Sequence, residues 1–190
     1  MASSVGHALC GISCLLAVNA ASPSRSIVVT GPSALLFIAL ANLPDVDFLV
    51  GYLVARDPHW IHQGPTHSLL FAVAVGLLAG LAWRKRPGPW LASAVFAATI
   101  LSHDIIDIFT GPAPGFNRSP GLALWWPLET ELISVPVTIF PGIRHLTLSD
   151  LVSWHNAMSI VHETAVFLPI IALLCVWRTQ GMRGRDGRAA

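Results

Sequence analysis

Charged residues are scarce in this sequence. Only 11% of the 190 residues are charged and 54% are hydrophobic, with a mean hydropathy of +0.65. Soluble domains carry about a quarter charged residues, and a soluble globule of this size could not remove so much apolar side chain from water. The same composition excludes a disordered chain. We therefore expect an integral membrane protein with one compact domain over residues 1–178.

Lysine and cysteine are also rare, and their shortage excludes two further classes. The chain has one lysine and a net charge of +1, which gives no indication of nucleic-acid binding. Cys10, Cys14 and Cys175 all fall in apolar stretches, as is typical of small membrane hydrophobes rather than of a disulfide framework. Against this background, the eight histidines and ten acids need an explanation.

Apolar stretches predict an all-α integral membrane bundle of about five spans. A helix needs about 20 residues to cross about 30 Å of hydrocarbon. The stretches that approach this length are residues 5–21, 27–43, 66–83, 90–109 and 164–177. Residues 111–150 are rich in Pro, Gly and Trp, so we expect an interfacial or re-entrant segment there, with Trp125 and Trp126 at the headgroup level. Residues 179–190 are expected to form a disordered basic tail.

The charges sort to opposite ends of these spans. With five alternating spans, one face receives eight basic residues and is therefore the cytoplasmic face: Arg25, Arg84, Lys85, Arg86, Arg178, Arg183, Arg185 and Arg188. The other face receives all the histidines and every acid except Asp186. Ionisable groups at membrane depth are costly and by default mark a functional site. We therefore expect a site on the non-cytoplasmic side of the cytoplasmic (inner) membrane.

The first span has a second interpretation. It could be a signal peptide with small residues at 18–20 as the cleavage site, although no basic residue precedes Arg25. Cleavage would remove His7 from the set of polar residues.

Two short motifs supply histidines to the non-cytoplasmic side. His103 and Asp107 are four residues apart, so on a helix they share a face and either grip one cation or satisfy each other by a hydrogen bond. In residues 62–68 a Gly-Pro turn precedes a helix start and brings His62 and His67 together, unless both are simply interfacial histidines. Thr66 and Ser68 are candidates either to cap that helix or to orient a histidine ring.

A third motif supplies carboxylates. In an extended Pro44-Asp45-Val46-Asp47 segment, Asp45 and Asp47 point the same way and either repel or share a cation. Solvated acids at a loop boundary are the alternative. His7 lies near the same end of the first span. We treat His155, His162 and Glu163 as additional ligand candidates and expect His59 and His145 to be bystanders.

Together these side chains are suited to a divalent metal. Three or four nitrogen and oxygen ligands with an open position suit Zn²⁺, while more carboxylates allow Mn²⁺ or Fe, and seven candidates leave room for two ions. A metal would lower the pKa of bound water toward about 7, and Asp45 or Asp47 could instead serve as general base. The sequence has no nucleophile elbow, His-Glu-x-x-His run or phosphate loop.

The order and spacing of these motifs resemble a known family. His7, residues 44–47, residues 62–68, the His103–Asp107 pair and Trp126-Pro127 are similar to the pattern of the membrane-bound, predicted metal-dependent hydrolases, which include a LexA-regulated inner-membrane protein of bacteria. One departure is Gln63, where that pattern has Arg. The family has a remote likeness to zinc-dependent phospholipase C. The likeness implies five metal ligands, His7, Asp45, His67, His103 and Asp107, and leaves Asp47 and His62 as catalytic candidates.

Three functions remain open at this point. The first is a membrane-embedded hydrolase that uses metal-activated water on a phosphoester or lipid-borne ester, with membrane lipid as its partner. The second is a transporter or ion-handling protein that uses the same His/Asp cluster. The third is a scaffold in which a metal staples helix ends. The sequence gives no indication of oligomeric state.

Overall fold

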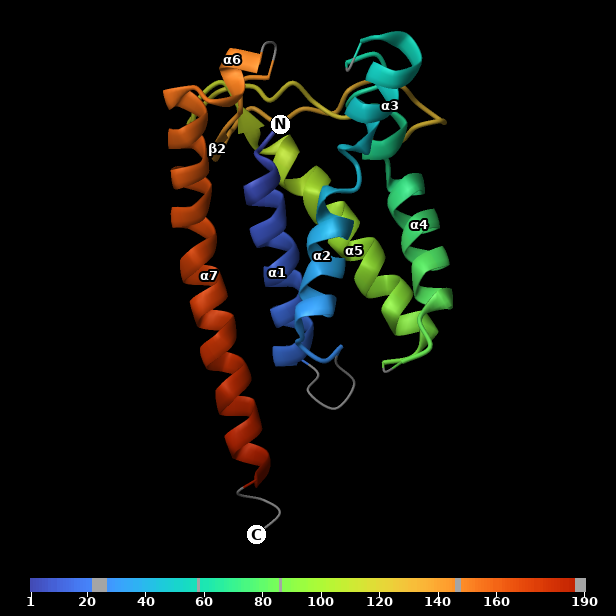
Figure 1. Ribbon diagram of the computed structural model, residues 1–190, viewed down its shortest axis with the longest axis vertical. Coiled ribbons are helices and arrows are strands. Elements are labelled where there is room, and N and C mark those ends of the chain that lie inside the picture. The colour runs from blue at the N-terminus through green and yellow to red at the C-terminus, as the bar shows by residue number, and fades with distance from the viewer. Residues whose placement is uncertain (22–26, 58, 86, 146–147, 187–190) are drawn as a thin grey trace.

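The chain folds into a bundle of helices, as its apolar stretches predict (Figure 1). The computed structural model describes residues 1–21, 27–57, 59–85, 87–145 and 148–186. The longer helices are α1 (Ser4–Ala21), α2 (Gly31–Asn42), α3 (Val46–Ala55), α4 (Leu69–Ala82), α5 (Pro89–Ile108) and α7 (Trp154–Asp186). Short elements complete the fold: the 3-10 turn η1 (Pro65–His67), β1 (Thr110–Gly111), β2 (Phe140–Pro141) and α6 (Leu148–Leu151). The protein is an all-α membrane helical bundle, which confirms the expected fold class.

The helices that can cross a membrane are fewer than the five expected. In the described part of the chain, α1, α5 and residues 154–180 of α7 are long and apolar enough. Helices α2 and α3 are bent by 54° and pass the same test only as a pair, either as one broken span or as a re-entrant loop. Helix α4 has 14 residues, which cover about 21 Å at 1.5 Å per residue. It is short because Pro65–His67 forms a 3-10 turn and Ser68 caps α4, so the helix begins later than expected.

The C-terminal boundary also differs from the expectation. Helix α7 does not end near residue 177 but continues to Asp186, so residues 179–186 of the expected disordered tail are helical. Residues 187–190, including Arg188, lie outside the described residues.

Small residues set the close packing of the helices. A side chain at Gly76 or Gly80 of α4 would meet the backbone of α5, because a Cβ at Gly80 would lie 2.2 Å from the nitrogen of Ser93. Membrane helices associate through such small residues because lipid gives no hydrophobic drive between them. Next to this contact, Phe37 of α2 and Phe96 of α5 are fully buried and meet edge to face. Helix α7 lies along α1 at the side of the bundle (Figure 1).

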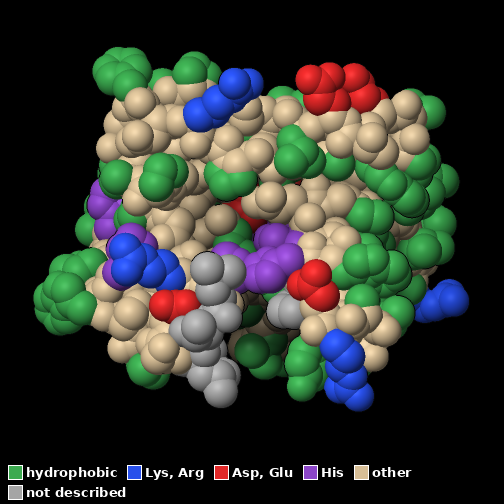
Figure 2. Space-filling model, turned by 90° about the horizontal axis from the view of Figure 1, so that it is seen from above, with side chains coloured by type: hydrophobic (Ala, Val, Ile, Leu, Met, Phe, Trp, Pro, Cys, Tyr) green, Lys and Arg blue, Asp and Glu red, His purple; other side chains and the backbone are tan. Residues whose placement is uncertain are grey.

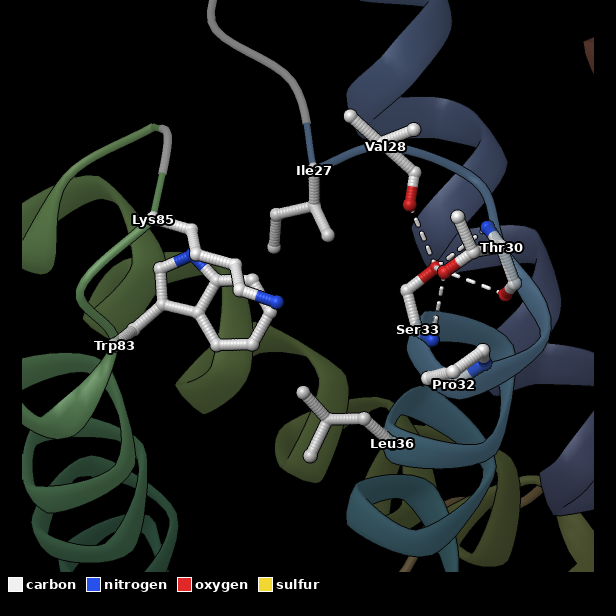
Figure 3. Close-up of a pocket in the computed structure, with 8 residues that line it drawn as sticks. All are labelled: Ile27, Val28, Thr30, Pro32, Ser33, Leu36, Trp83 and Lys85. Carbon is white, nitrogen blue, oxygen red and sulfur yellow. Dashed lines mark hydrogen bonds between the residues drawn. The ribbon is translucent and has the colours of Figure 1, made fainter.

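The two ends of the bundle carry different segments. Residues 109–145 run across one end, together with α3, α6 and the N-terminus (Figure 1). This segment is therefore interfacial in its placement, and the Trp125 side chain is half exposed. The opposite end carries the α1–α2 connection, the α4–α5 turn with Lys85, and the C-terminal end of α7 (Figures 1 and 3). Arg25 and Arg86, which we assigned to this end, lie outside the described residues.

Candidate metal centre

Histidine and acidic side chains from four segments meet at the end of the bundle covered by residues 109–145. Seen from that end, histidines gather around a hollow at the middle of the face (Figure 2). Helix α1 supplies His7, the α2–α3 bend supplies Asp45 and Asp47, η1 supplies His67, and the last turns of α5 supply His103 and Asp107. The sequence-predicted ligand residues are therefore neighbours in space, although up to 100 residues separate them along the chain.

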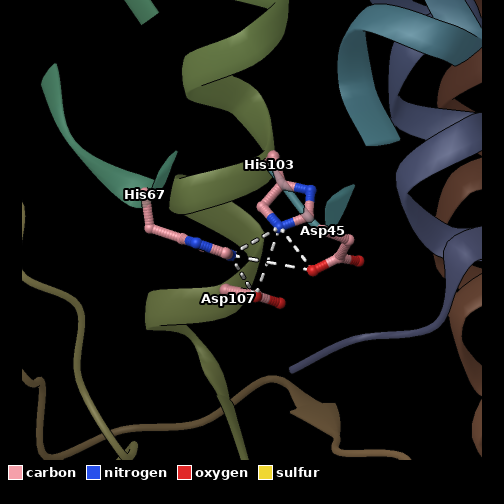
Figure 4. Close-up of side chains that lie close together, drawn as sticks. All are labelled: Asp45, His67, His103 and Asp107. Atoms are coloured by element: carbon pink, nitrogen blue, oxygen red, sulfur yellow. Dashed lines mark hydrogen bonds and ion pairs between the residues drawn. The ribbon is translucent and has the colours of Figure 1, made fainter. Parts of the chain in front are cut away.

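Four of these residues point one ligand atom each toward a common point (Figure 4). The Nε2 atom of His103 lies 3.2 Å from Nε2 of His67, 3.4 Å from Oδ1 of Asp45 and 3.5 Å from Oδ2 of Asp107. Nε2 of His67 lies 3.7 Å from the same Asp45 oxygen and 3.9 Å from the same Asp107 oxygen. Ligands held at 2.0–2.1 Å by a tetrahedral metal are about 3.3 Å apart. The arrangement therefore fits a tetrahedral divalent ion with little rearrangement.

The other ring nitrogen of each histidine is already engaged, which fixes the ring orientation. Nδ1 of His103 donates to the carbonyl oxygen of Ala41 at 2.8 Å. Nδ1 of His67 lies 3.2 Å from the Thr66 hydroxyl and 3.3 Å from an oxygen of Asp47. With both Nδ1 atoms donating, both Nε2 lone pairs face the shared point. Hydrogen bonding of the distal nitrogen is how metal-binding histidines are usually oriented.

Asp47 holds several of these side chains in place. It is fully buried and accepts hydrogen bonds from Nδ1 of His62 at 3.1 Å and from the Thr66 hydroxyl at 2.8 Å. Asp47, His62 and His67 form a second group of side chains that could hold a metal ion, with Asp47 next to Nδ1 of His67. Because its oxygens already have these partners, Asp47 is better placed to orient His62 and His67 than to bind an ion itself.

The two candidates for capping or orienting the histidine turn divide the roles. Ser68 caps α4 by accepting from the backbone N–H of Phe71 at 3.1 Å. Thr66 instead donates to Asp47 and contacts the His67 ring. Ser68 thus fixes the start of α4, directly after η1, and Thr66 contacts the imidazole ring of His67 itself.

The acidic motif is not extended, which corrects one expectation. Asp45 has helical backbone angles and Asp47 lies in the first turn of α3. Their carboxylates therefore do not point the same way: Asp45 faces Nε2 of His67 and His103, whereas Asp47 faces Nδ1 of His67. The 54° bend between α2 and α3 places the two acids on opposite sides of one imidazole.

His7 lies beside the four-residue group rather than in it. Its Nε2 atom is 3.4 Å from Oδ1 of Asp107, and its ring stacks on His103 with centroids 3.7 Å apart. Both ring nitrogens of His7 are buried without a hydrogen-bond partner. His7 thus contacts two of the candidate ligands, His103 and Asp107. It approaches Oδ1 of Asp107, whereas Oδ2 of Asp107 faces His103 and His67.

The electrostatics of the centre favour a cation. Both oxygens of Asp45 and Oδ2 of Asp107 are buried without a hydrogen-bond partner. In the part of the chain that is described, the ion pairs of these carboxylates are all with histidines. Burial alone would lower the pKa of His67, but the nearby carboxylates of Asp45 and Asp47 outweigh it and raise that pKa to about 9. Buried carboxylates without partners are costly, so the residues present fit a divalent metal.

Other polar residues at this end serve different contacts. Nε2 of His155 donates to Gly142 and Nε2 of His162 to Ile139, each through a backbone carbonyl. Glu163 is buried against Ser3, from which it accepts both the backbone N–H and the hydroxyl. None of these three additional candidates belongs to a metal-ligand group among the described residues.

The expected bystanders lie closer to the site than their sequence positions indicated. The rings of His59, His62 and His145 all pack against Phe48, with centroids 5.5, 4.0 and 5.3 Å away. Burial lowers the pKa of His145. His59 and His145 therefore lie beside His62, and neither belongs to a metal-ligand group among the described residues.

One acid was missed by the sequence reasoning. Asp104 is only 3% exposed, and neither of its carboxylate oxygens has a hydrogen-bond partner. The available signal was its place inside an apolar span, where an acid is costly wherever its side chain points.

Comparison with known proteins places the chain in a membrane family. The sequence pattern of the YdjM inner membrane protein family matches residues 1–182. The inner membrane protein YbcI of Escherichia coli (strain K12) is 31% identical over 155 residues, covering 77% of this chain and 86% of that protein. No solved structure matches the chain significantly. Neither name states an activity, so the expected hydrolase activity stays a prediction. The helical bundle with its His/Asp centre belongs to the YdjM inner membrane protein family.

Proposed function

We propose that this protein is a membrane-embedded, metal-dependent hydrolase that acts on a phosphoester or lipid-borne ester at the membrane interface. The observation that carries the proposal is the convergence of Asp45, His67, His103 and Asp107 on one point. The two Nε2 atoms lie 3.2 Å apart, close enough to share one metal ion. Zn²⁺ suits this ligand set best, and Mn²⁺ or Fe are the alternatives.

The four residues would hold the ion, and the rest of the centre would serve the reaction. A bound divalent ion supplies a Lewis acid and lowers the pKa of its water toward about 7. Asp47 keeps His67 aligned through Nδ1. The Asp45 side chain is 12% exposed while the other three are fully buried, so reactants reach the centre past Asp45.

The Asp47–His62 pair is the proposed proton carrier. Asp47 accepts from Nδ1 of His62, which leaves Nε2 of His62 buried without a partner. A carboxylate behind an imidazole fixes its tautomer and leaves the far nitrogen free to take and return a proton. His62 is therefore the general base of the proposal, and Asp47 orients it.

We place the centre on the non-cytoplasmic side of the inner membrane. Lys85 lies at the opposite end of the bundle, with the C-terminal end of α7. Basic connections favour the cytoplasm, which supports this orientation.

Metal content and hydrolysis test the proposal together. Elemental analysis of detergent-purified protein should find a stoichiometric divalent metal. Removal with a chelator should abolish hydrolysis of phosphoesters and lipids, and re-addition of Zn²⁺ or Mn²⁺ should restore it. A protein that binds no metal would contradict the ligand assignment, and a metal-loaded protein inactive on the whole panel would contradict the enzyme proposal.

One observation favours ion handling as the second candidate. Helices α2 and α3 break at Pro44 and Asp45, and broken helices with polar groups at the break form ion sites in transporters. Transport requires access from both faces. Labelling of an Asp45→Cys variant from both sides of the membrane would favour transport over hydrolysis, and labelling from one side alone would oppose transport.

A further inference from the structure

An apolar groove lies beside the metal centre, between α4, α5 and residues 122–128. It consists of two hollows, of about 260 and 410 Å³, that share Leu69 and Leu124. Asp104 lines the smaller hollow, and Val73 and Leu128 line the larger one. Apart from Asp104, the side chains that line both hollows are apolar. We call these two hollows the α4–α5 groove.

The groove contains a buried acid whose carboxylate has no hydrogen-bond partner among the described residues. Asp104 is 3% exposed, and both of its carboxylate oxygens lack hydrogen-bond partners. An unpaired polar group in an apolar wall costs several kcal/mol. Because Asp104 lines the smaller hollow, a molecule that occupies the groove can supply the missing hydrogen-bond partner.

Residues that line the groove are neighbours in sequence of residues in the metal centre. Asp104 follows His103 directly in α5, and Leu69 is two residues beyond His67. The N–H of Leu69 donates to the carbonyl oxygen of Leu124 at 3.0 Å, and the N–H of Ala123 donates to that of Gln63 at 2.9 Å. These bonds attach the 122–128 wall to the turn that carries the histidines. A molecule in the groove would place its polar end next to the centre.

The outer part of the groove opens toward the membrane. Val73, on the side of α4, is 46% exposed, and Leu128, in the segment across the end of the bundle, is 91% exposed. The indole of Trp125, half exposed, lies at the rim, where amphipathic rings sit at the headgroup level. Charge is absent from the walls except at Asp104, which excludes a water-soluble anion as the occupant of the groove.

We propose that the α4–α5 groove holds one hydrocarbon chain of a membrane lipid, with Asp104 hydrogen-bonded to the polar group at the head of that chain. The substrate of the metal centre is then a lipid-borne ester that enters sideways from the bilayer. This substrate assignment rests on the proposed hydrolase function, whereas lipid binding by the groove does not.

Lipid retention tests the groove without reference to activity. The full-length protein, purified in mild detergent after reconstitution with dipalmitoyl phosphatidylglycerol, is examined by native mass spectrometry. Val73→Trp fills the groove, and Leu173→Trp on exposed, lipid-facing α7 is the matched control. We expect wild type and Leu173→Trp to retain one lipid and Val73→Trp to lose it at least about tenfold, the equivalent of about two buried methylene groups. Equal retention by all three proteins, or none by wild type, overturns the proposal.

Asp104 is tested by paired substitutions in the same assay. Asp104→Leu removes the hydrogen bond and Asp104→Asn keeps one. Retention should fall in Asp104→Leu and recover in Asp104→Asn, with metal content unchanged in both. Equal retention in the two variants would remove Asp104 from the proposal, and loss of metal in Asp104→Leu alone would assign it to the centre instead.

The substrate assignment is tested with matched substrates, phosphatidic acid and its chain-free headgroup glycerol phosphate. Val73→Trp should lower kcat/KM for phosphatidic acid about tenfold and leave glycerol phosphate within about twofold. Equal loss on both substrates contradicts a role for the groove in substrate selection. Turnover of neither by the metal-loaded wild type contradicts the hydrolase function, while the lipid-retention result still decides whether the groove binds lipid.

Discussion

The two ends of the bundle satisfy their polar groups in different ways. At the end opposite the metal centre, a hollow of about 330 Å³ is lined by Ile27, Leu36 and Trp83 (Figure 3). There the Ser33 hydroxyl donates to the carbonyl of Val28 at 2.7 Å, and Thr30 and Ser33 cap α2 reciprocally. At the metal-centre end, Asp45 has no hydrogen-bond partner, and Asp107 lacks one for Oδ2. Polar groups that hydrogen-bond to their own backbone stabilise a helix end, whereas the unpartnered carboxylate oxygens at the metal-centre end face histidine nitrogens.

The largest effect is expected from removing two ligands at the metal-centre end. The double variant His103→Ala, Asp107→Ala should lose its metal completely, because two of four converging atoms disappear. Elemental analysis of the purified protein measures this. The matched control at the other end, Ser33→Ala, should keep full metal content. Full retention of metal by the double variant would reject the ligand assignment.

Cysteines introduced at the two ends of the bundle should be labelled from opposite sides of the membrane only. In a background without Cys10, Cys14 and Cys175, a cysteine replacing Lys85 should react with an impermeant maleimide only from the cytoplasmic side. A cysteine replacing exposed Glu131 should react only from the other side. Gel-shift labelling of inverted and right-side-out vesicles distinguishes the two positions. Reaction of the cysteine at position 85 from the non-cytoplasmic side would overturn the proposed orientation, and reaction of both positions from the same side would contradict their placement at opposite ends.

A smaller effect is expected when the ligands remain and their support is weakened. Asp47→Asn keeps the shape of the side chain but loses the charge that aligns His62 and His67. Metal affinity should fall about 10- to 100-fold, as for other groups that orient metal-binding histidines. Competition with a calibrated chelator provides the measurement. An unchanged affinity would mean that Asp47 serves only His62.

The smallest effect is expected at the end without the centre. Thr30→Ala removes the α2 cap and should cost about 1 kcal/mol of stability. Metal affinity should not change, because Thr30 contacts no residue of the centre. Thermal unfolding in detergent together with chelator competition tests both statements. A drop in metal affinity would show that the two ends are coupled through α2.

The helices themselves could be predicted from sequence because their signals are local. Runs of apolar residues specify α1, α5 and α7, and the Gly-Pro turn before Ser68 sets the start of α4. The bend at Pro44 was expected to be extended, since nothing within the motif itself shows that α3 follows. The span expected over residues 66–83 was too long for a similar reason. Composition does not distinguish the 3-10 turn at Pro65–His67 from the first turn of an α-helix, and α4 begins only at Leu69.

The residues of the centre could be named from sequence, but their grouping could not. Sequence alone determined that costly imidazoles and carboxylates lie near the ends of apolar segments, because each must lie where a membrane helix can tolerate it. Tertiary structure alone decided that Nε2 of His103 meets Nε2 of His67, 36 positions away, and that His7 stacks beside them instead of joining the group. It also decided that Asp104, one residue from His103, faces an apolar groove. Adjacent positions on a helix point in directions about 100° apart, so only the packing of α5 against its neighbours determines which acid faces the histidines and which faces the apolar groove.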